Sequence, residues 1–176
     1  MTERELSNAM NAYGDTVYRL ALCRLQHTAD AEDVYQDVFL RLLEQPSKGW
    51  DGEHLKAWLI RATLNRCADL GRLRSRRGTL PLSELPDRAG PTDDGAAELW
   101  DAVSRLPEKL RTAVHLFYGE GYESREIGTL LGVPAATVRS RLRRARAELK
   151  LELGGFEDEE SLSRHDGDHP YARRAE

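Results

Sequence analysis

The chain has 176 residues, of which 26 are Lys or Arg and 30 are Asp or Glu, so its formal net charge is −4. That length allows one domain or two small ones and excludes a large multidomain enzyme. The apolar runs fall far short of the roughly 20 residues that cross a bilayer, and the first residues lack the segments of a signal peptide. We therefore expect a soluble cytoplasmic protein, whose mild overall acidity argues by itself against nucleic-acid binding.

Apolar residues spaced by three or four positions predict helices in the first part of the chain. The first helix spans roughly residues 5–25. After a break, Asp30 is the predicted N-cap of a second helix, whose buried stripe is Val34, Val38, Leu42 and Leu43. A loop rich in proline and glycine precedes a third helix from about Glu53 to Arg74, which Gly71 is expected to end early.

Arginine is concentrated toward the end of the third predicted helix. Between Arg61 and Gly78 there are six arginines and one acid, Asp69. Clustered cations on a helix are typical of phosphate binding, but a solvated helix face gives the same pattern. The charge count alone leaves both interpretations open.

Residues 78–97 hold three prolines and three glycines among scattered acids, and we interpret them as a flexible linker. A second helical segment follows. In it, Pro107 suits the first turn of a helix that Gly119 and Gly121 break, and Ser124 is the predicted cap of a short helix. After a tight turn at 132–134, the last helix carries on one side Val138, Leu142, Ala145, Leu149 and Leu153.

These last elements have the order and lengths of a helix–turn–helix. Six basic residues and one acid lie between Arg139 and Lys150, which favours a DNA-binding helix over a purely structural helix pair. Residues 154–176 are acidic and predict a disordered tail. The tail either serves solubility alone or competes with DNA for the arginines.

Residues for metal or covalent chemistry are not arranged in a known pattern. Cys23 and Cys67 form no CxxC motif, and we expect both to be buried, inert thiols. The five histidines show no metal-ligand spacing, and the chain has no phosphate-binding glycine loop. We therefore expect no metal, no cofactor and no enzymatic activity.

Two blocks of sequence carry a resemblance to a known family. The first comprises Asp30 to Leu42, Ala57 to Asn65, and Asp69; the second comprises Leu106 to Arg111, Gly121, Glu126-Ile127 and Thr137 to Arg146. In this order across a linker, they resemble regions 2 and 4 of the bacterial sigma-70 family. The resemblance covers about residues 8–153 and is strongest to the extracytoplasmic-function (ECF) class, which lacks region 3.

The resemblance implies an all-α fold with two small helical domains joined by a flexible linker. Region 2 would occupy residues 5–77, the linker 78–97, the region 4 helix–turn–helix 98–153, and an acidic tail 154–176. The implied partners are RNA polymerase core, through its β′ clamp helices and β subunit, and promoter DNA. Family members are often held inactive by an anti-sigma factor, which is a further implied partner.

The resemblance also implies site residues. It assigns polymerase binding to Asp33, Gln36, Asp37, Leu40 and Arg41. It assigns the minus-ten element to Trp50, Arg61, Asn65, Arg72, Arg74 and Arg76. It assigns the minus-thirty-five element to Thr137, Arg139, Ser140, Arg141, Arg143 and Arg144.

The chemical properties of the side chains are compatible with the assignment to the minus-ten element. In the family, the loop before the tryptophan helix captures a flipped base of the minus-ten element, and the resemblance places that loop here at about Pro46 to Leu55. Such a base needs a stacking surface and a hydrogen-bonding edge, and Asn65 offers both a donor and an acceptor. Trp50 either stacks on that base or anchors its loop, whereas we expect Trp58 to pack in the core. Gly128 stands where the family usually has alanine, so either the backbone approaches closely there or the domain is less stable.

The function that the resemblance implies is a sigma factor, which directs RNA polymerase to promoters. The alternative is a stand-alone helix–turn–helix regulator. The two differ in the helix at residues 30–43. A sigma factor needs its polar side and Leu40 exposed for polymerase, whereas a dimeric regulator needs an apolar side for its twin.

Overall fold

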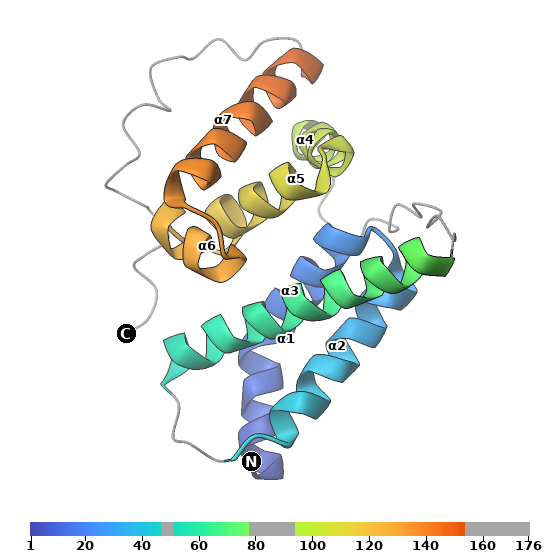
Figure 1. Cartoon of the computed structure of the whole chain (residues 1–176), viewed down its shortest axis with the longest axis vertical. Helices are drawn as coiled ribbons and strands as arrows, with labels where there is room; N and C mark the ends of the chain where they lie inside the picture. The colour runs from blue at the N-terminus through green and yellow to red at the C-terminus, as the bar shows by residue number, and fades with distance from the viewer. Residues whose placement is uncertain (47–50, 78–93, 154–176) are drawn as a thin grey trace. The chain divides into compact units, whose positions relative to one another are not determined.

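The protein is described from a computed structural model, which covers residues 1–46, 51–77 and 94–153. Within these ranges every regular element is a helix, which confirms the all-α fold (Figure 1). The chain divides into two compact units, Met1–Ala89 and Gly90–Glu176. Among the described helices, none combines the length and the apolar character that a membrane span requires.

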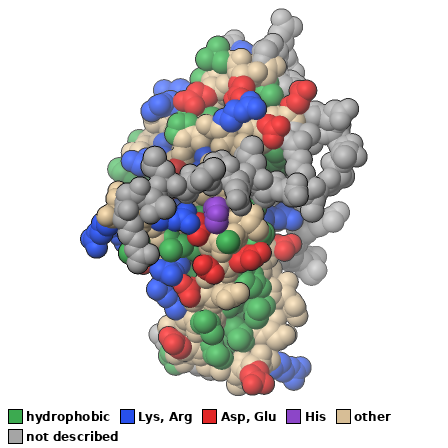
Figure 2. Space-filling model, turned by 90° about the vertical axis from the view of Figure 1, so that its right-hand side faces the viewer, with side chains coloured by type: hydrophobic (Ala, Val, Ile, Leu, Met, Phe, Trp, Pro, Cys, Tyr) green, Lys and Arg blue, Asp and Glu red, His purple; other side chains and the backbone are tan. Residues whose placement is uncertain are grey.

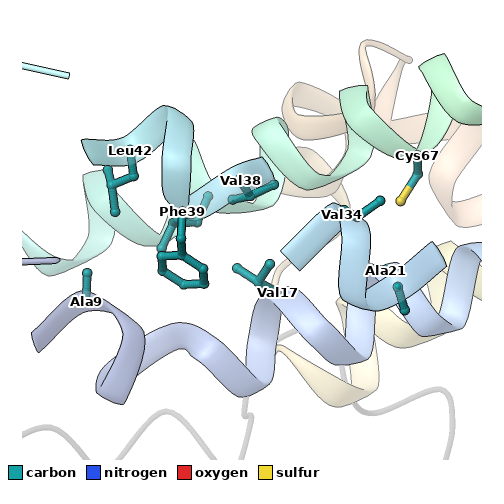
Figure 3. Packing of buried hydrophobic residues seen from close by; sticks show 10 residues of the cluster. Ala9, Val17, Ala21, Val34, Val38, Phe39, Leu42 and Cys67 are labelled. Atoms are coloured by element: carbon teal, nitrogen blue, oxygen red, sulfur yellow. The ribbon is translucent and has the colours of Figure 1, made fainter. Parts of the chain in front are cut away.

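The N-terminal unit consists of α1 (Glu3–Leu25), α2 (Thr28–Leu43) and α3 (Gly52–Arg77), which pack against one another. Figure 3 shows its core, in which Val17 and Ala21 of α1 lie against α2, and Cys67 of α3 lies beside Val34 of α2. Trp58 is half-buried and packs against this core, as expected. The α2 contribution to the core is Ala31, Val34, Val38, Phe39 and Leu42.

Two expectations about burial in this unit are wrong. Leu43 is 38% exposed, because it follows Leu42 by one position and is rotated by about 100° away from the Val34–Val38–Leu42 stripe. Phe39 is buried in its place. Cys67 is buried as expected, but Cys23 is only half-buried.

Side chains cap the N-termini of the first two helices. Thr2 and Glu5 form a reciprocal capping box at the start of α1. The predicted N-cap of α2, Asp30, is wrong: the cap is His27, whose Nδ1 accepts the backbone N–H of Asp30 at 3.3 Å. Asp30 lies in the first turn instead, where its buried carboxylate pairs with Arg74 at the far end of α3.

Helix α3 does not stop at Gly71, contrary to expectation, but continues to Arg77. A helical glycine costs only about 1 kcal/mol, which neighbouring contacts can offset. Here the turn after Gly71 is held by the ion pair between Arg74 and Asp30 of α2. The tertiary contact therefore outweighs the local propensity.

The C-terminal unit contains α4 (Asp94–Arg105), α5 (Glu108–Val114), the π-helical segment His115–Gly119, α6 (Ser124–Leu131) and α7 (Ala135–Glu152). Helix α4 begins inside the segment predicted as linker, whose remaining residues lie outside the described ranges. Helix α7 packs against α4, α5 and α6. Its buried residues are Val138, Leu142 and Ala145, which belong to the predicted stripe.

The predicted cap of α6, Ser124, is wrong. Glu123 has the extended N-cap conformation and forms a capping box in which the Glu126 carboxylate accepts the Glu123 N–H at 2.8 Å. Ser124 is the first helical residue, because the extended backbone ends one position earlier, at Glu123. As predicted, the preceding helical segment ends at Gly119, and Gly121 has a φ of +76°.

A buried arginine joins α4 to α5. Arg111 is 7% exposed, and its Nη1 donates to the carbonyl oxygen of Leu106 at 2.6 Å and of Ser104 at 3.3 Å. These carbonyls lie at the C-terminal end of α4, where helical carbonyls lack intrahelical donors and a positive charge is favourable. Arg111 thus caps α4 from the next helix.

Candidate nucleic-acid interface

Helix α7 presents the residues predicted for the minus-thirty-five element. All of them lie outside the buried side formed by Val138, Leu142 and Ala145. Thr137 and Arg141 are half-buried. The other members of the set are exposed, namely Arg139, Ser140, Arg143 and Arg144.

The cations of α7 fall on two sides of the helix. We call one the α7 cationic side: it is defined by intervals of four, three and four residues and comprises Arg139, Arg143, Arg146 and Lys150. The opposite flank carries Thr137, Arg141 and Arg144. The carboxylate of Glu148 lies 3.8 Å from Arg144. Among the described residues, by contrast, Arg139, Arg143 and Lys150 form no ion pair.

The turn that positions α7 requires a glycine in α6. A Cβ at Gly128 would lie 2.6 Å from the backbone oxygen of Val133, and the Val133 N–H donates to the Gly128 oxygen at 2.9 Å. Gly132 completes the turn with a φ of +67°, a conformation that glycine adopts readily. Of the two explanations for Gly128, the geometry supports close backbone approach.

Helix α3 presents a second row of polar and basic side chains. Arg61, Asn65, Arg72 and Arg76 recur at intervals of four, seven and four residues, so they share one exposed side over about 22 Å. Arg72 pairs with Asp69 one turn earlier. Arg74 was predicted in the same set but does not share this side, because it is directed at Asp30 of α2.

The N-terminal end of α3 is fixed by contacts around Gly52. The Tyr13 hydroxyl of α1 donates to the Gly52 oxygen at 3.1 Å, and Asp51 caps the helix by accepting the His54 N–H at 2.8 Å. The hydrogen bond from the His54 N–H is the largest cause that lowers the pKa of Asp51 below its ordinary value of 3.8, and the hydrogen bond from the His54 side chain is the next largest. Trp50, the predicted stacking residue, lies outside the described residues.

Helix α2 presents the residues predicted to bind polymerase. Asp33, Gln36 and Arg41 are exposed, and Leu40 is 60% exposed. Asp37 differs, because its carboxylate accepts the Nε–H of Arg66 on α3 at 2.5 Å. Figure 2 shows hydrophobic side chains gathered on one exposed face of the N-terminal unit, with acidic and basic side chains around them.

Sequence reasoning missed several residues that position these surfaces. Arg66 holds Asp37 across a separation of 29 residues, and Tyr118 accepts a hydrogen bond from Arg146 of α7 at 3.2 Å. Neither contact has a local sequence signal, since each depends on how two helices pack. The buried position of Arg111 is equally hidden, because arginine is a residue type that is usually exposed.

No cluster of His, Cys, Asp or Glu suited to a metal ion occurs among the described residues. The geometry defines a protein of two helical units, each with an exposed row of arginines, the second on a helix–turn–helix. Family models agree: sigma-70 region 2 matches residues 9–79, and sigma-70 region 4 matches residues 96–149. The chain belongs to the sigma-70 family and, by its relatives, to the ECF class.

Similar curated proteins carry the same class name. The chain is 35% identical to ECF RNA polymerase sigma factor SigE of Mycolicibacterium smegmatis, over 86% of this chain and 62% of that protein. It is 32% identical to SigM of Mycobacterium tuberculosis, over 78% of this chain and 71% of that protein. SigW of Bacillus subtilis is 26% identical, over 84% of this chain and 88% of that protein. The chain therefore matches somewhat less than two thirds of the length of SigE.

Solved structures show the same fold. The sigma factor RpoE of Bartonella quintana, in complex with the anti-sigma factor NepR, matches with a TM-score of 0.67 and 24% identity, over 86% of this chain and 96% of that chain. CnrH, in complex with the cytosolic domain of CnrY, matches with a TM-score of 0.59 and 24% identity, over 87% of this chain and 90% of that chain.

Proposed function

We propose that this chain is a promoter-specificity subunit of RNA polymerase. In this role it binds the polymerase core, directs it to promoters and takes part in initiation, with no catalytic step of its own. The observation that carries the proposal is the pair of exposed arginine rows on α3 and α7, one in each unit. Membership of the ECF class supports it and favours this role over that of a stand-alone regulator.

DNA recognition is divided between the units in this proposal. Arg61, Asn65, Arg72 and Arg76 of α3 contact the minus-ten element, while Arg74 chiefly ties α3 to α2. Helix α7 enters the major groove of the minus-thirty-five element. Arginine can bond guanine bidentately, with each such pair contributing about 1–3 kcal/mol of discrimination, whereas phosphate contacts add affinity without sequence information.

Polymerase binding is assigned to the exposed side of α2. Leu40 supplies an apolar contact, and Asp33, Gln36 and Arg41 supply polar contacts around it. Asp37 contributes charge from the edge of this side, where Arg66 holds it. The partner would be a basic and apolar surface of the polymerase core, for which the β′ clamp helices are the candidate. The protein would act in the cytoplasm. An anti-sigma factor remains a proposed regulator.

The test combines holoenzyme assembly with promoter binding. Purified full-length chain is mixed with core polymerase and promoter DNA, and Arg143→Ala is compared with Lys109→Ala, which removes an exposed cation of α5. Arg143→Ala should assemble normally but bind the promoter more weakly, by about 1–3 kcal/mol if a base contact is lost. If the contact is to phosphate, the salt dependence should instead decrease by about one charge. Unchanged promoter binding at moderate salt would contradict the groove assignment.

A further inference from the structure

The α7 cationic side carries positive charge that the described part of the protein leaves uncompensated. The two acids of α7 are engaged elsewhere, since Glu148 lies beside Arg144 and Glu152 pairs with Arg105 of α4. Arg143 and Lys150 are exposed and, within the described ranges, have no carboxylate partner. An anionic segment would therefore find this side of the helix available.

The sequence places such a segment directly after α7. Residues 154–176 contain seven acids and three arginines, and four of the acids are consecutive, at 157–160. Gly154 and Gly155 separate these acids from the end of the helix. Because glycine adopts both left- and right-handed backbone conformations at little cost, the pair allows the chain to reverse direction.

The distances along the two segments match. At 1.5 Å per helical residue, Lys150 lies about 4.5 Å, Arg143 about 15 Å and Arg139 about 21 Å back from Leu153. At about 3.3 Å per extended residue, the acids at 157–160 lie about 13–23 Å beyond Leu153. A chain that reverses at the two glycines can therefore lay these acids beside Arg143 and Arg139.

We propose that the acidic segment Glu157–Glu160 docks on the α7 cationic side and competes there with DNA phosphates. The proposal rests on the assignment of α7 as the DNA-contacting helix. A tether this short gives an effective concentration in the millimolar range, so even a weak contact is populated. Promoter DNA offers a denser line of charge and displaces the segment once polymerase has brought α7 to its site.

The competition has a defined salt dependence. Charges on an exposed helix are screened over about 10 Å at 0.1 M salt and about 3 Å at 1 M. At low salt, neutralising the four acids should therefore strengthen binding to a DNA duplex about threefold to tenfold. The gain should largely disappear at high salt.

The experiment uses the full-length chain and a variant with Glu157→Gln, Asp158→Asn, Glu159→Gln and Glu160→Gln. First, the Nε–H resonances of Arg139 and Arg143 are followed by NMR without DNA. They should shift in the variant, while that of Arg144 on the opposite flank should not. Second, duplex binding is measured by fluorescence anisotropy at low and high salt. A third chain, in which residues 156–160 are transposed to follow Pro170, keeps the net charge and separates docking from general repulsion.

Arg139 and Arg143 resonances that do not shift would overturn the proposal, whatever the DNA measurement shows. Equal DNA affinity of the transposed and original chains would overturn it as well, because repulsion alone would then explain the effect. Arg143→Ala in the neutralised background tests the underlying assignment separately. If that change leaves DNA binding intact while the NMR shifts are present, the tail contact stands, but α7 is not the DNA-contacting helix and competition is excluded.

Discussion

Replacing Arg111 by methionine should destabilise the C-terminal unit more than any change on its surface. Arg111 is 7% exposed and donates to the carbonyl oxygens of Leu106 and Ser104 at the end of α4. Methionine has a similar length and no hydrogen-bonding hydrogen, so it removes these bonds while keeping most of the packing. The change therefore tests whether α4 is held to α5 by this capping arrangement.

The magnitude follows from the two bonds. A hydrogen bond to a charged group contributes about 1.5–3 kcal/mol, and a buried carbonyl that loses its donor costs about 1–3 kcal/mol. The 3.3 Å bond is the weaker of the two, and the apolar methionine regains part of the loss. We expect a net loss of about 2–4 kcal/mol. For a unit of this size, that lowers the Tm by at least about 8 °C.

Hydrogen exchange followed by mass spectrometry is the suitable assay, because the two units need not unfold together. Peptides from α4 and α5 should exchange much faster in Arg111→Met, while peptides from α1 and α2 should not change. Lys109→Met alters an exposed cation of the same helix and should leave both sets unchanged. If Arg111→Met melts within about 2 °C of the unmodified chain, or matches Lys109→Met, the capping role is refuted.

The other predictions concern helix ends and the joint between α2 and α3. Asp37→Lys should weaken polymerase binding and should also cost about 0.5–1 kcal/mol of stability, because the new lysine faces Arg66 with a like charge in a partly exposed site. Adding Arg66→Asp should restore the stability but not the polymerase binding. Gly71→Ala should gain about 0.5–1 kcal/mol in urea unfolding because nothing lies near the new Cβ, whereas Gly128→Ala should gain nothing or lose stability. Asp51→Ala should speed hydrogen exchange in the first turn of α3, and Asp51→Asn should not. Because the folded pKa of Asp51 is lowered, its capping contribution is present above pH 3.8 and is lost as the pH falls through the folded pKa.

Periodicity was sufficient to predict which segments are helical and which side of α7 is buried. Val138 and Leu142 recur at an interval that only one helix side satisfies, so their burial needs no knowledge of the partner helix. Periodicity also predicts that Leu40 lies outside the buried stripe of α2, and the resemblance to sigma region 2 predicts a role for its exposed side chain. The assignment of α7 to DNA stays a prediction, which rests on its arginines and on the resemblance to sigma region 4.

Contacts between helices could not be predicted in the same way. Asp30 has the residue type of an N-cap, but His27 caps the helix, and Asp30 is occupied by an arginine 44 positions later. Gly71 has a low helix propensity, but the same ion pair holds the turn that follows it. In both cases the local preference is worth about 1 kcal/mol, and the outcome is decided by a partner that only the folded chain brings near.

The most direct test of the proposed function is transcription in vitro with purified core polymerase, this chain and a genomic DNA library, followed by mapping of the start sites. We expect new start sites that depend on the chain and share two short upstream elements at a constant spacing, which two DNA-contacting units require. Arg143→Ala should reduce initiation at these sites. If the only start sites are those that core polymerase makes alone, the chain is not a promoter-specificity subunit.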